Sequence, residues 1–263
     1  MVYAEQHPLW EHRQLLLILA FACMLLEMGV LALRFRDTYQ PGLMLGTTAM
    51  WFVEQGGRLL MFPFRASVFV LVGSVAWQTI NPCLVSAVVL YVAVDFLYYW
   101  KHRILHRYAW AWALHNVHHS TDDMNLMAAL RLGWVQRWVD DFFYLPLALI
   151  GFDPLFILLI VELNHASQFW CHTRCIGALG WLDRAINTPA NHRVHHARER
   201  VMADHNYGST LMCWDRWFGT YLAEPTTGVR DFGLAEGPVG LHPLRIQLRP
   251  LVRYAKSLLA ARG

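Results

Sequence analysis

Long apolar segments constrain the fold of this 263-residue chain more than any other feature. Leu15–Leu33 and Cys83–Trp100 are each long enough to cross a bilayer core of about 30 Å as a helix. Weaker or shorter apolar segments are Gly42–Phe64, Ala66–Ile80, Phe142–Ile150 and Leu155–Trp170. Charged residues make up 16% of the chain, against roughly 25% in soluble domains. We therefore predict an all-α protein, an integral membrane helical bundle of about four to six spans.

The order of these segments predicts which parts of the chain share one side of the membrane. The sequence GFDP at 151–154 predicts a tight turn between two helices, because Gly, Asp and Pro favour turns. Residues 101–131 and 171–263 would then lie on the same side, and their many arginines indicate that this side is cytoplasmic. We expect membrane helices over 1–81, a catalytic region over 82–225 and a cytoplasmic tail over 226–263, all in one structural unit. Short loops suggest a bacterial inner membrane.

Several functional classes are disfavoured by composition. The net charge of +3 is small and the basic residues are interleaved with acids, so no nucleic-acid partner is expected. The five cysteines form no C-x-x-C pair. We find no G-x-G-x-x-G dinucleotide motif and no removable signal peptide. The sequence gives no indication of oligomeric state.

Histidine is concentrated in the middle of the chain at helical spacing. Ten of the 14 histidines lie between residues 102 and 196. Residues three, four or seven apart share one face of a helix, so each set can direct its rings to one point. The sets are His102 and His106; His115, His118 and His119; His165 and His172; His192, His195 and His196.

This clustering predicts a binuclear metal site in a cytoplasmic helical cap. Neutral imidazole is the commonest metal ligand, and grouping these rings without a metal would leave unpaired donors or like charges together. Ten rings exceed the capacity of one ion. Imidazole suits Zn, Cu, Fe and Ni, so the spacing alone leaves the metal open. Asp95 lies seven residues before His102, where its carboxylate could accept a proton from a ligand imidazole.

Three histidine motifs resemble those of a known family. HRILH (102–106), HNVHH (115–119) and HRVHH (192–196) look like the histidine boxes of the membrane-bound fatty acid hydroxylase/sterol desaturase superfamily. The segments 164–173 and 187–221 are most similar to its sterol-desaturase-like branch, which includes alkylglycerol monooxygenase. The resemblance covers roughly residues 85–225.

The resemblance implies two iron ions that use molecular oxygen to oxidise an unactivated C–H bond. The implied metal ligands are His102, His106, His115, His118, His119, His165, His172, His192, His195 and His196. Asn164 could orient His165. Relatives often have histidine in place of Asn191, so this residue is either a group behind the ligands or a helix N-cap. Asp204, Asn206, Tyr207 and Asp215 match the family pattern, and we expect them to hold the cap together.

The expected activity is that of an oxygen-dependent lipid hydroxylase. Ligands that continue directly from a membrane helix predict a substrate that arrives from the bilayer. A lipid desaturase would use the same site, and a zinc-dependent membrane hydrolase is a less favoured alternative. Electrons must come from a separate donor such as a ferredoxin, a cytochrome or a reductase. Arg193, Arg198 and Arg200 either form a docking patch for that donor or lie at the lipid headgroups.

Overall fold

The computed structural model describes residues 8–34, 41–199 and 201–260, and the regular structure of these residues is helical. Extended backbone pairs in them only as isolated bridges, such as that between Ile80 and Phe152. The prediction of an all-α chain is therefore confirmed for the described residues. The chain forms two units, Met1–Gln40 and Pro41–Gly263. The first contains α1 (Pro8–Arg34), which includes the predicted segment Leu15–Leu33. The predicted boundaries at residues 81 and 225 stay predictions.

Helix α2 (Pro41–Gly73) merges two segments that the sequence analysis treats separately. The helix runs without interruption through Arg65, which lies between the two segments and forms a buried ion pair with Asp141. Arg58 likewise reaches Glu162 at 2.5 Å. Charges inside an apolar helix are stable when they have partners, which explains why the apolar pattern is interrupted but the helix is not.

Helix α3 (Leu84–Arg107) begins at a capping box and continues beyond the predicted apolar segment. The Cys83 side chain accepts a hydrogen bond from the Ser86 amide, and the Ser86 hydroxyl accepts one from the Cys83 amide at 2.8 Å. The helix extends seven residues past Trp100, so His102 and His106 are part of it. Within the described residues, Leu45–Gly73 and Leu84–Arg107 are long and apolar enough to cross a membrane.

The predicted helical hairpin around GFDP is confirmed. Helix α6 (Leu145–Ile150) ends at Gly151, whose φ of 113° is readily adopted by glycine. Helix α7 (Pro154–Ala166) begins after Asp153, whose side chain accepts a hydrogen bond from the Phe156 amide at 2.9 Å.

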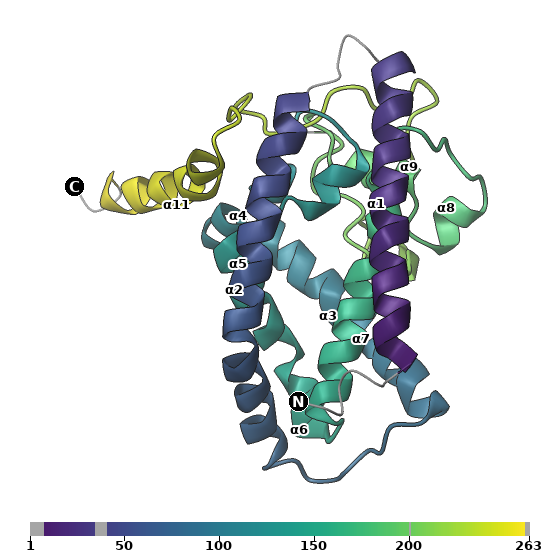
Figure 1. The fold of residues 1–263 in the computed structure, drawn as a ribbon, viewed down its shortest axis with the longest axis vertical. Helices are drawn as coiled ribbons and strands as arrows, with labels where there is room; N and C mark the ends of the chain where they lie inside the picture. The colour runs from purple at the N-terminus through teal and green to yellow at the C-terminus, as the bar shows by residue number, and fades with distance from the viewer. Residues whose placement is uncertain (1–7, 35–40, 200, 261–263) are drawn as a thin grey trace. The chain divides into compact units, whose positions relative to one another are not determined.

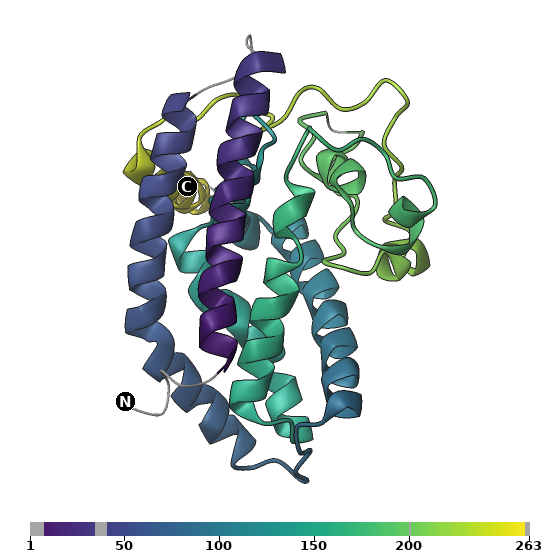
Figure 2. The same ribbon diagram turned by 45° about the vertical axis from the view of Figure 1, so that its right-hand side comes forward.

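Helix α7 packs against both α2 and α3 in the second unit (Figures 1 and 2). Their shared core includes Phe69, Leu90, Tyr144, Ile157 and Val161. The opposite faces of these helices carry exposed leucines and valines, as expected for surfaces that contact lipid.

Short helices and loops cover the end of the bundle where α3 finishes. These elements and the residues that follow them carry the clustered histidines outside α3, except His165, which lies in α7. The short elements are α4 (Ala109–His115), η1 (His118–Ser120), η2 (Leu126–Leu130), α5 (Trp134–Asp140), η3 (Asp141–Tyr144), η4 (Phe169–Cys171), α8 (Leu182–Ala185), α9 (Pro189–His195) and α10 (Cys213–Trp217). A final helix, α11 (Pro243–Ala260), packs on α2 and α4. It lies transverse to α2 in both views (Figures 1 and 2).

Candidate metal centre

Nine of the ten clustered histidines converge in two groups at the end of α3. In each group the ligand nitrogens lie within 4.8 Å of one another. The five-histidine group consists of His102, His106, His115, His119 and His195. The four-histidine group consists of His118, His172, His192 and His196. Eight of these residues are buried, and the side chain of His106, the ninth, is only 5% exposed.

Neighbouring histidines in each H-x-x-H-H box belong to different groups. His115 and His119 lie in one group, whereas His118 between them belongs to the other. In the second box His192 and His196 stay together and His195 separates. The expectation that each box directs all its rings to one point is therefore wrong. Positions four apart project in nearly the same direction, whereas consecutive positions differ by about 100°. Each box thus supplies both groups.

Backbone carbonyls orient four of the nine rings through Nδ1. His102 donates to Tyr207 O at 2.9 Å, His118 to Arg131 O at 3.2 Å, and His172 to Gln168 O at 3.0 Å. His195 donates to His205 O at 2.9 Å. A carbonyl only accepts, so Nδ1 must carry the proton in these rings. Their Nε2 atoms are then lone-pair acceptors.

These lone pairs face one another. In the four-histidine group, His172 Nε2 lies 3.2 Å from His118 Nε2 and 2.9 Å from His192 Nε2. His196 Nε2 lies 3.1 Å from the Nε2 atoms of the same two residues, His118 and His192. In the five-histidine group His102 Nε2 lies 3.0 Å from His115 Nε2, while the Nε2 atoms of His106 and His195 are buried without a hydrogen-bond partner. The Nε2 lone pairs of His118 and His172 in one group, and of His102, His115 and His195 in the other, can bind a cation, because Nδ1 carries the proton in these rings. The donor set therefore fits a metal ion in each group.

Burial keeps these rings neutral. Removal from water lowers the pKa of His118 to about 4 and that of His195 to about 3, from an ordinary value of 6.5. Burial, followed by neighbouring histidines, lowers the pKa of His119 and His196 in the same direction. Neutral imidazole is the form that binds metals, so the site is prepared for binding at neutral pH.

His165 lies outside both groups. Its Nε2 is 3.4 Å from Lys101 Nζ, and its ring packs against Tyr98. Its assignment as a ligand stays a prediction from the resemblance. The neighbouring Asn164 does not contact its ring in any described interaction, but donates to Asp95 Oδ1 at 2.9 Å.

Asp95 binds groups other than histidines. Its carboxylate accepts hydrogen bonds from Asn164, the Trp214 indole at 2.8 Å and the amides of Thr210 and Leu211 at 2.9 and 3.2 Å. The expectation that it binds a ligand imidazole is not met by these contacts. Asp95 instead attaches the 210–214 segment to α3 and has no described contact with a ligand ring.

Residues 204–215 form the loop that supplies two of the carbonyl acceptors. Asp204 and Asn206 adopt positive φ values of 63° and 56°. Asn206 donates to Asn191 O at 3.0 Å, and Asp215 accepts from the amides of Tyr207 and Gly208 at 2.7 Å. These residues hold the cap, as the sequence analysis expects.

Asn191 lies inside α9 rather than at its N-cap, which is Thr188. Its side chain donates to Asp183 O at 2.6 Å and to Ile186 O at 3.1 Å. Asn191 therefore anchors the helix that carries His192, His195 and His196.

Two side chains that the sequence analysis does not place beside the ligands, Gln136 and Trp112, contact the converging histidines. Gln136 accepts from His115 Nδ1 at 3.3 Å and donates to Asp140, which in turn binds Lys101 at 3.1 Å. The Trp112 ring lies 5.1 Å from that of His106 and 5.4 Å from that of His119. The only signal in the sequence for Trp112 is its position three residues before His115, which places it on the same helical face.

Two arginines of the suggested docking patch have partners within the chain. Arg193 is buried, pairs with Glu224 at 2.6 Å and donates to Thr173 O and Ile176 O. Arg198 pairs with Asp122 at 2.7 Å and Asp231 at 2.9 Å. Arg200 lies outside the described residues. Burial makes Arg193 unavailable to a docking partner, whereas the docking role of the half-buried Arg198 stays a prediction.

Comparison with known protein families assigns the histidine-rich region to a family. The family model described as "Fatty acid hydroxylase" matches residues 87–220, just over half of the 263 residues and all ten clustered histidines. This chain belongs to the fatty acid hydroxylase family. The family assignment agrees with the resemblance seen in the sequence.

Individual relatives within and around this family are lipid-modifying enzymes by name. Alkylglycerol monooxygenases of Homo sapiens and Xenopus tropicalis are 41% and 38% identical over 66% of this chain. An ornithine lipid hydroxylase of Rhizobium tropici is 27% identical over 60% of this chain and 48% of its own length. The chain spans 38% of the length of the first two relatives. No solved structure matches the chain.

Proposed function

We propose that this chain is the catalytic part of a di-iron, oxygen-dependent membrane oxidoreductase that hydroxylates a C–H bond of a lipid. The observation that carries the proposal is the convergence of nine neutral imidazoles in two adjacent groups at the end of an apolar helix. Imidazole donors suit iron, and membership of the fatty acid hydroxylase family favours iron over the alternative metals.

In this proposal the five-histidine group holds one iron ion and the four-histidine group holds the other. Bound iron would supply the redox chemistry that activates molecular oxygen for attack on the substrate. The chain's own contribution is to keep the imidazoles neutral, to fix their tautomers and to exclude water. The tautomers are fixed by backbone carbonyls, because hydrogen-bond partners behind metal ligands orient the ligand rings. These carbonyls belong to Tyr207, Arg131, Gln168 and His205.

The proposed enzyme is a multi-pass membrane protein with its metal centre on the cytoplasmic side, as in a bacterial inner membrane. Helices α2 and α3 are the strongest spans, and the α6–α7 hairpin and α1 would complete the expected four to six. Arginines and lysines at the histidine-rich end support the cytoplasmic placement.

The substrate class is a membrane lipid. The Homo sapiens and Xenopus tropicalis relatives are named for an alkylglycerol and the Rhizobium tropici relative for an ornithine lipid. A sterol desaturase of Aspergillus fumigatus is 26% identical over 54% of this chain. Desaturation is therefore the second candidate, and the more similar monooxygenases favour hydroxylation. A separate electron donor would supply the two electrons.

Oxygen labelling tests the proposal. Membranes from cells with and without the protein would be incubated under ¹⁸O₂ with an electron source, and their lipids compared by mass spectrometry. One ¹⁸O gained in a single lipid class is the expected result. Loss of two hydrogens without label would establish desaturation instead. No oxygen-dependent change in any lipid, from membranes with iron-loaded protein and a competent reductant, would contradict the proposal.

A further inference from the structure

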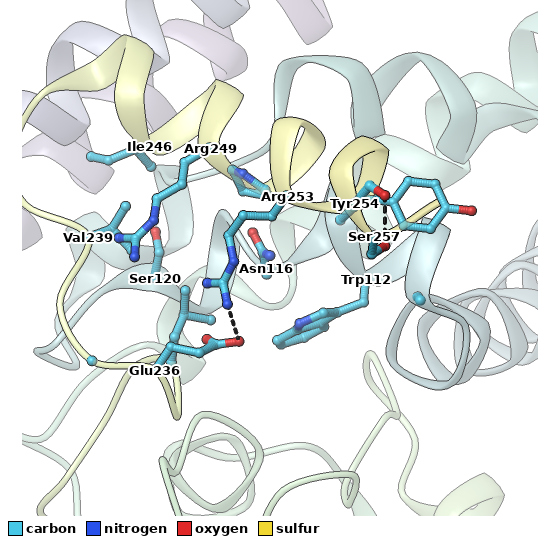
Figure 3. A pocket seen from close by; sticks show the side chains of 15 residues that line it. Trp112, Asn116, Ser120, Glu236, Val239, Ile246, Arg249, Arg253, Tyr254 and Ser257 are labelled. Atoms are coloured by element: carbon cyan, nitrogen blue, oxygen red, sulfur yellow. Dashed lines mark hydrogen bonds and ion pairs between the residues drawn. The ribbon is translucent and has the colours of Figure 1, made fainter. Parts of the chain in front are cut away.

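A pocket lies between α4, α11 and the loop around residue 236. Its volume is about 230 Å³, and its wall includes Trp112, Asn116, Glu236, Arg249 and Arg253. Figure 3 shows Arg249 and Arg253 extending from α11 into this space. Because the Trp112 ring also packs on His106 and His119, a single side chain separates the pocket from the five-histidine group.

The pocket contains more positive charge than its own acid neutralises. Glu236 pairs with Arg253 at 3.6 Å, and both side chains are about half exposed, at 47% and 52%. Arg249 is half-buried and makes no hydrogen bond or ion pair with the residues that the structure describes. A guanidinium in that position has all its donors available for a carboxylate or phosphate.

A third guanidinium lies behind the pocket wall. Ser120 lines the pocket and accepts a hydrogen bond from Arg131 Nε at 2.9 Å. Arg131 is fully buried, and its two Nη atoms have no hydrogen-bond partner among the described residues. The buried Oδ1 atom of Asn116 also lacks a partner and can accept a hydrogen bond from a hydroxyl group. The pocket thus offers donors for an anion together with an acceptor for a hydroxyl.

The outer face of α11 indicates where such a ligand would come from. Leu244, Leu248 and Val252 recur every fourth residue and are each at least half exposed. A basic stripe of Arg245, Arg249, Arg253 and Lys256 runs beside them, and α11 contains no acidic residue. A helix with an exposed apolar stripe and adjoining cations is suited to the surface of an anionic membrane.

We propose that this pocket binds the phosphate-bearing headgroup of an anionic membrane lipid, with Arg249 and Arg253 as its ligands. In this proposal the bound lipid is the substrate, and its hydrocarbon chain passes Trp112 to reach the five-histidine group. This identification of the lipid as the substrate rests on the proposed function. Free phosphate shares the recognising chemistry, so the test must separate the two.

Binding to the full-length protein in detergent, measured by calorimetry, tests the assignment without metal or turnover. The probes are short-chain phosphatidylglycerol, short-chain phosphatidylcholine and inorganic phosphate. We expect phosphatidylglycerol to bind most tightly, and the double variant R249Q/R253Q to weaken it at least about tenfold. Glu236→Gln should tighten binding, because the carboxylate that competes for Arg253 is removed.

Arg245→Gln is the matched control, since Arg245 is exposed on the same helix and does not line the pocket. It should leave binding within about twofold of wild type. An equal loss in R245Q and R249Q/R253Q, or inorganic phosphate bound as tightly as the lipid, would overturn the proposal. Iron content is measured on the same samples. Failure of lipid binding with iron still bound would overturn the headgroup pocket alone, whereas absence of iron would count against the proposed di-iron function.

Discussion

The two histidine groups differ in how the protein holds them. In the five-histidine group two rings are anchored by side chains: His115 by Gln136 at 3.3 Å and His106 by Asp204 at 3.3 Å. In the four-histidine group the anchored rings, His118 and His172, use backbone carbonyls. The Nδ1 atoms of His192 and His196 have no described partner. The five-histidine group, in which backbone carbonyls hold only His102 and His195, can therefore be adjusted by side-chain substitution. The four-histidine group depends on the carbonyls of Arg131 and Gln168 and on its full set of ligands.

The largest effect should follow loss of a ligand from the smaller group. His192→Ala leaves three imidazoles, and we expect its iron ion and all turnover to be lost, a greater effect than the roughly 10–100-fold cost of losing an outer partner. His119→Ala leaves four imidazoles in the other group and should retain more iron. Iron quantification per chain checks both variants. Equal iron loss in the two variants would remove the proposed difference between the groups.

Substitution of Gln136 should have an intermediate effect confined to the five-histidine group. Gln136→Leu removes the acceptor for His115 Nδ1, so iron affinity at that group should fall roughly 10–100-fold. Gln136→Glu keeps an acceptor for His115 Nδ1 but loses the donor to Asp140, so it should restore part of the binding. Titration of metal-free protein with ferrous iron measures the two affinities separately. A loss that Glu fails to restore would indicate a packing defect rather than a role in orienting His115.

Acid should destabilise the metal-free protein in a defined pH range. The pKa values of His118 and His195 fall to about 4 and about 3 in the folded chain, from 6.5. The unfolded chain therefore binds protons first, and the free energy of unfolding decreases as pH falls from about 6.5. The contribution of these two histidines should level off once His195 also titrates near pH 3. Thermal melting against pH measures this, and melting temperatures that rise on acidification would contradict the burial of neutral rings.

The smallest effect is expected for the histidine outside both groups. His165→Ala should leave both iron ions in place, because the ring contacts Lys101 and Tyr98 rather than the converging Nε2 atoms. His242→Ala, at an exposed position, is the control for loss of a histidine elsewhere. Loss of one iron from His165→Ala alone would restore His165 to the ligand set that the family resemblance implies.

Sequence spacing identified the histidines but not their division between two groups. The i, i+4 pairs 115/119 and 192/196 were predictable from helical geometry. The departure of His118 and His195 depends on where α4, η1 and α9 end, which local spacing does not specify. Backbone acceptors such as Tyr207 O have no signature in the sequence.

The partners of charged residues within apolar segments could not be predicted from the sequence either. Arg65 separates two apolar segments in the sequence, although both belong to α2, because its partner Asp141 is distant in sequence. Asp95 was correctly singled out as a buried acid with a role, but its partners lie in the 210–214 segment rather than among the ligands. Pairing over such distances becomes visible only in the folded chain.

The central claim is that each histidine group holds one iron ion. Iron quantification combined with iron K-edge X-ray absorption on the anaerobically purified full-length protein tests it most directly. The account predicts two iron ions per chain, with imidazole nitrogens as the predominant ligands, and one ion in His192→Ala. Wild-type protein supplied with ferrous iron that binds one ion or none, or binds iron mainly through oxygen or sulfur, would contradict it.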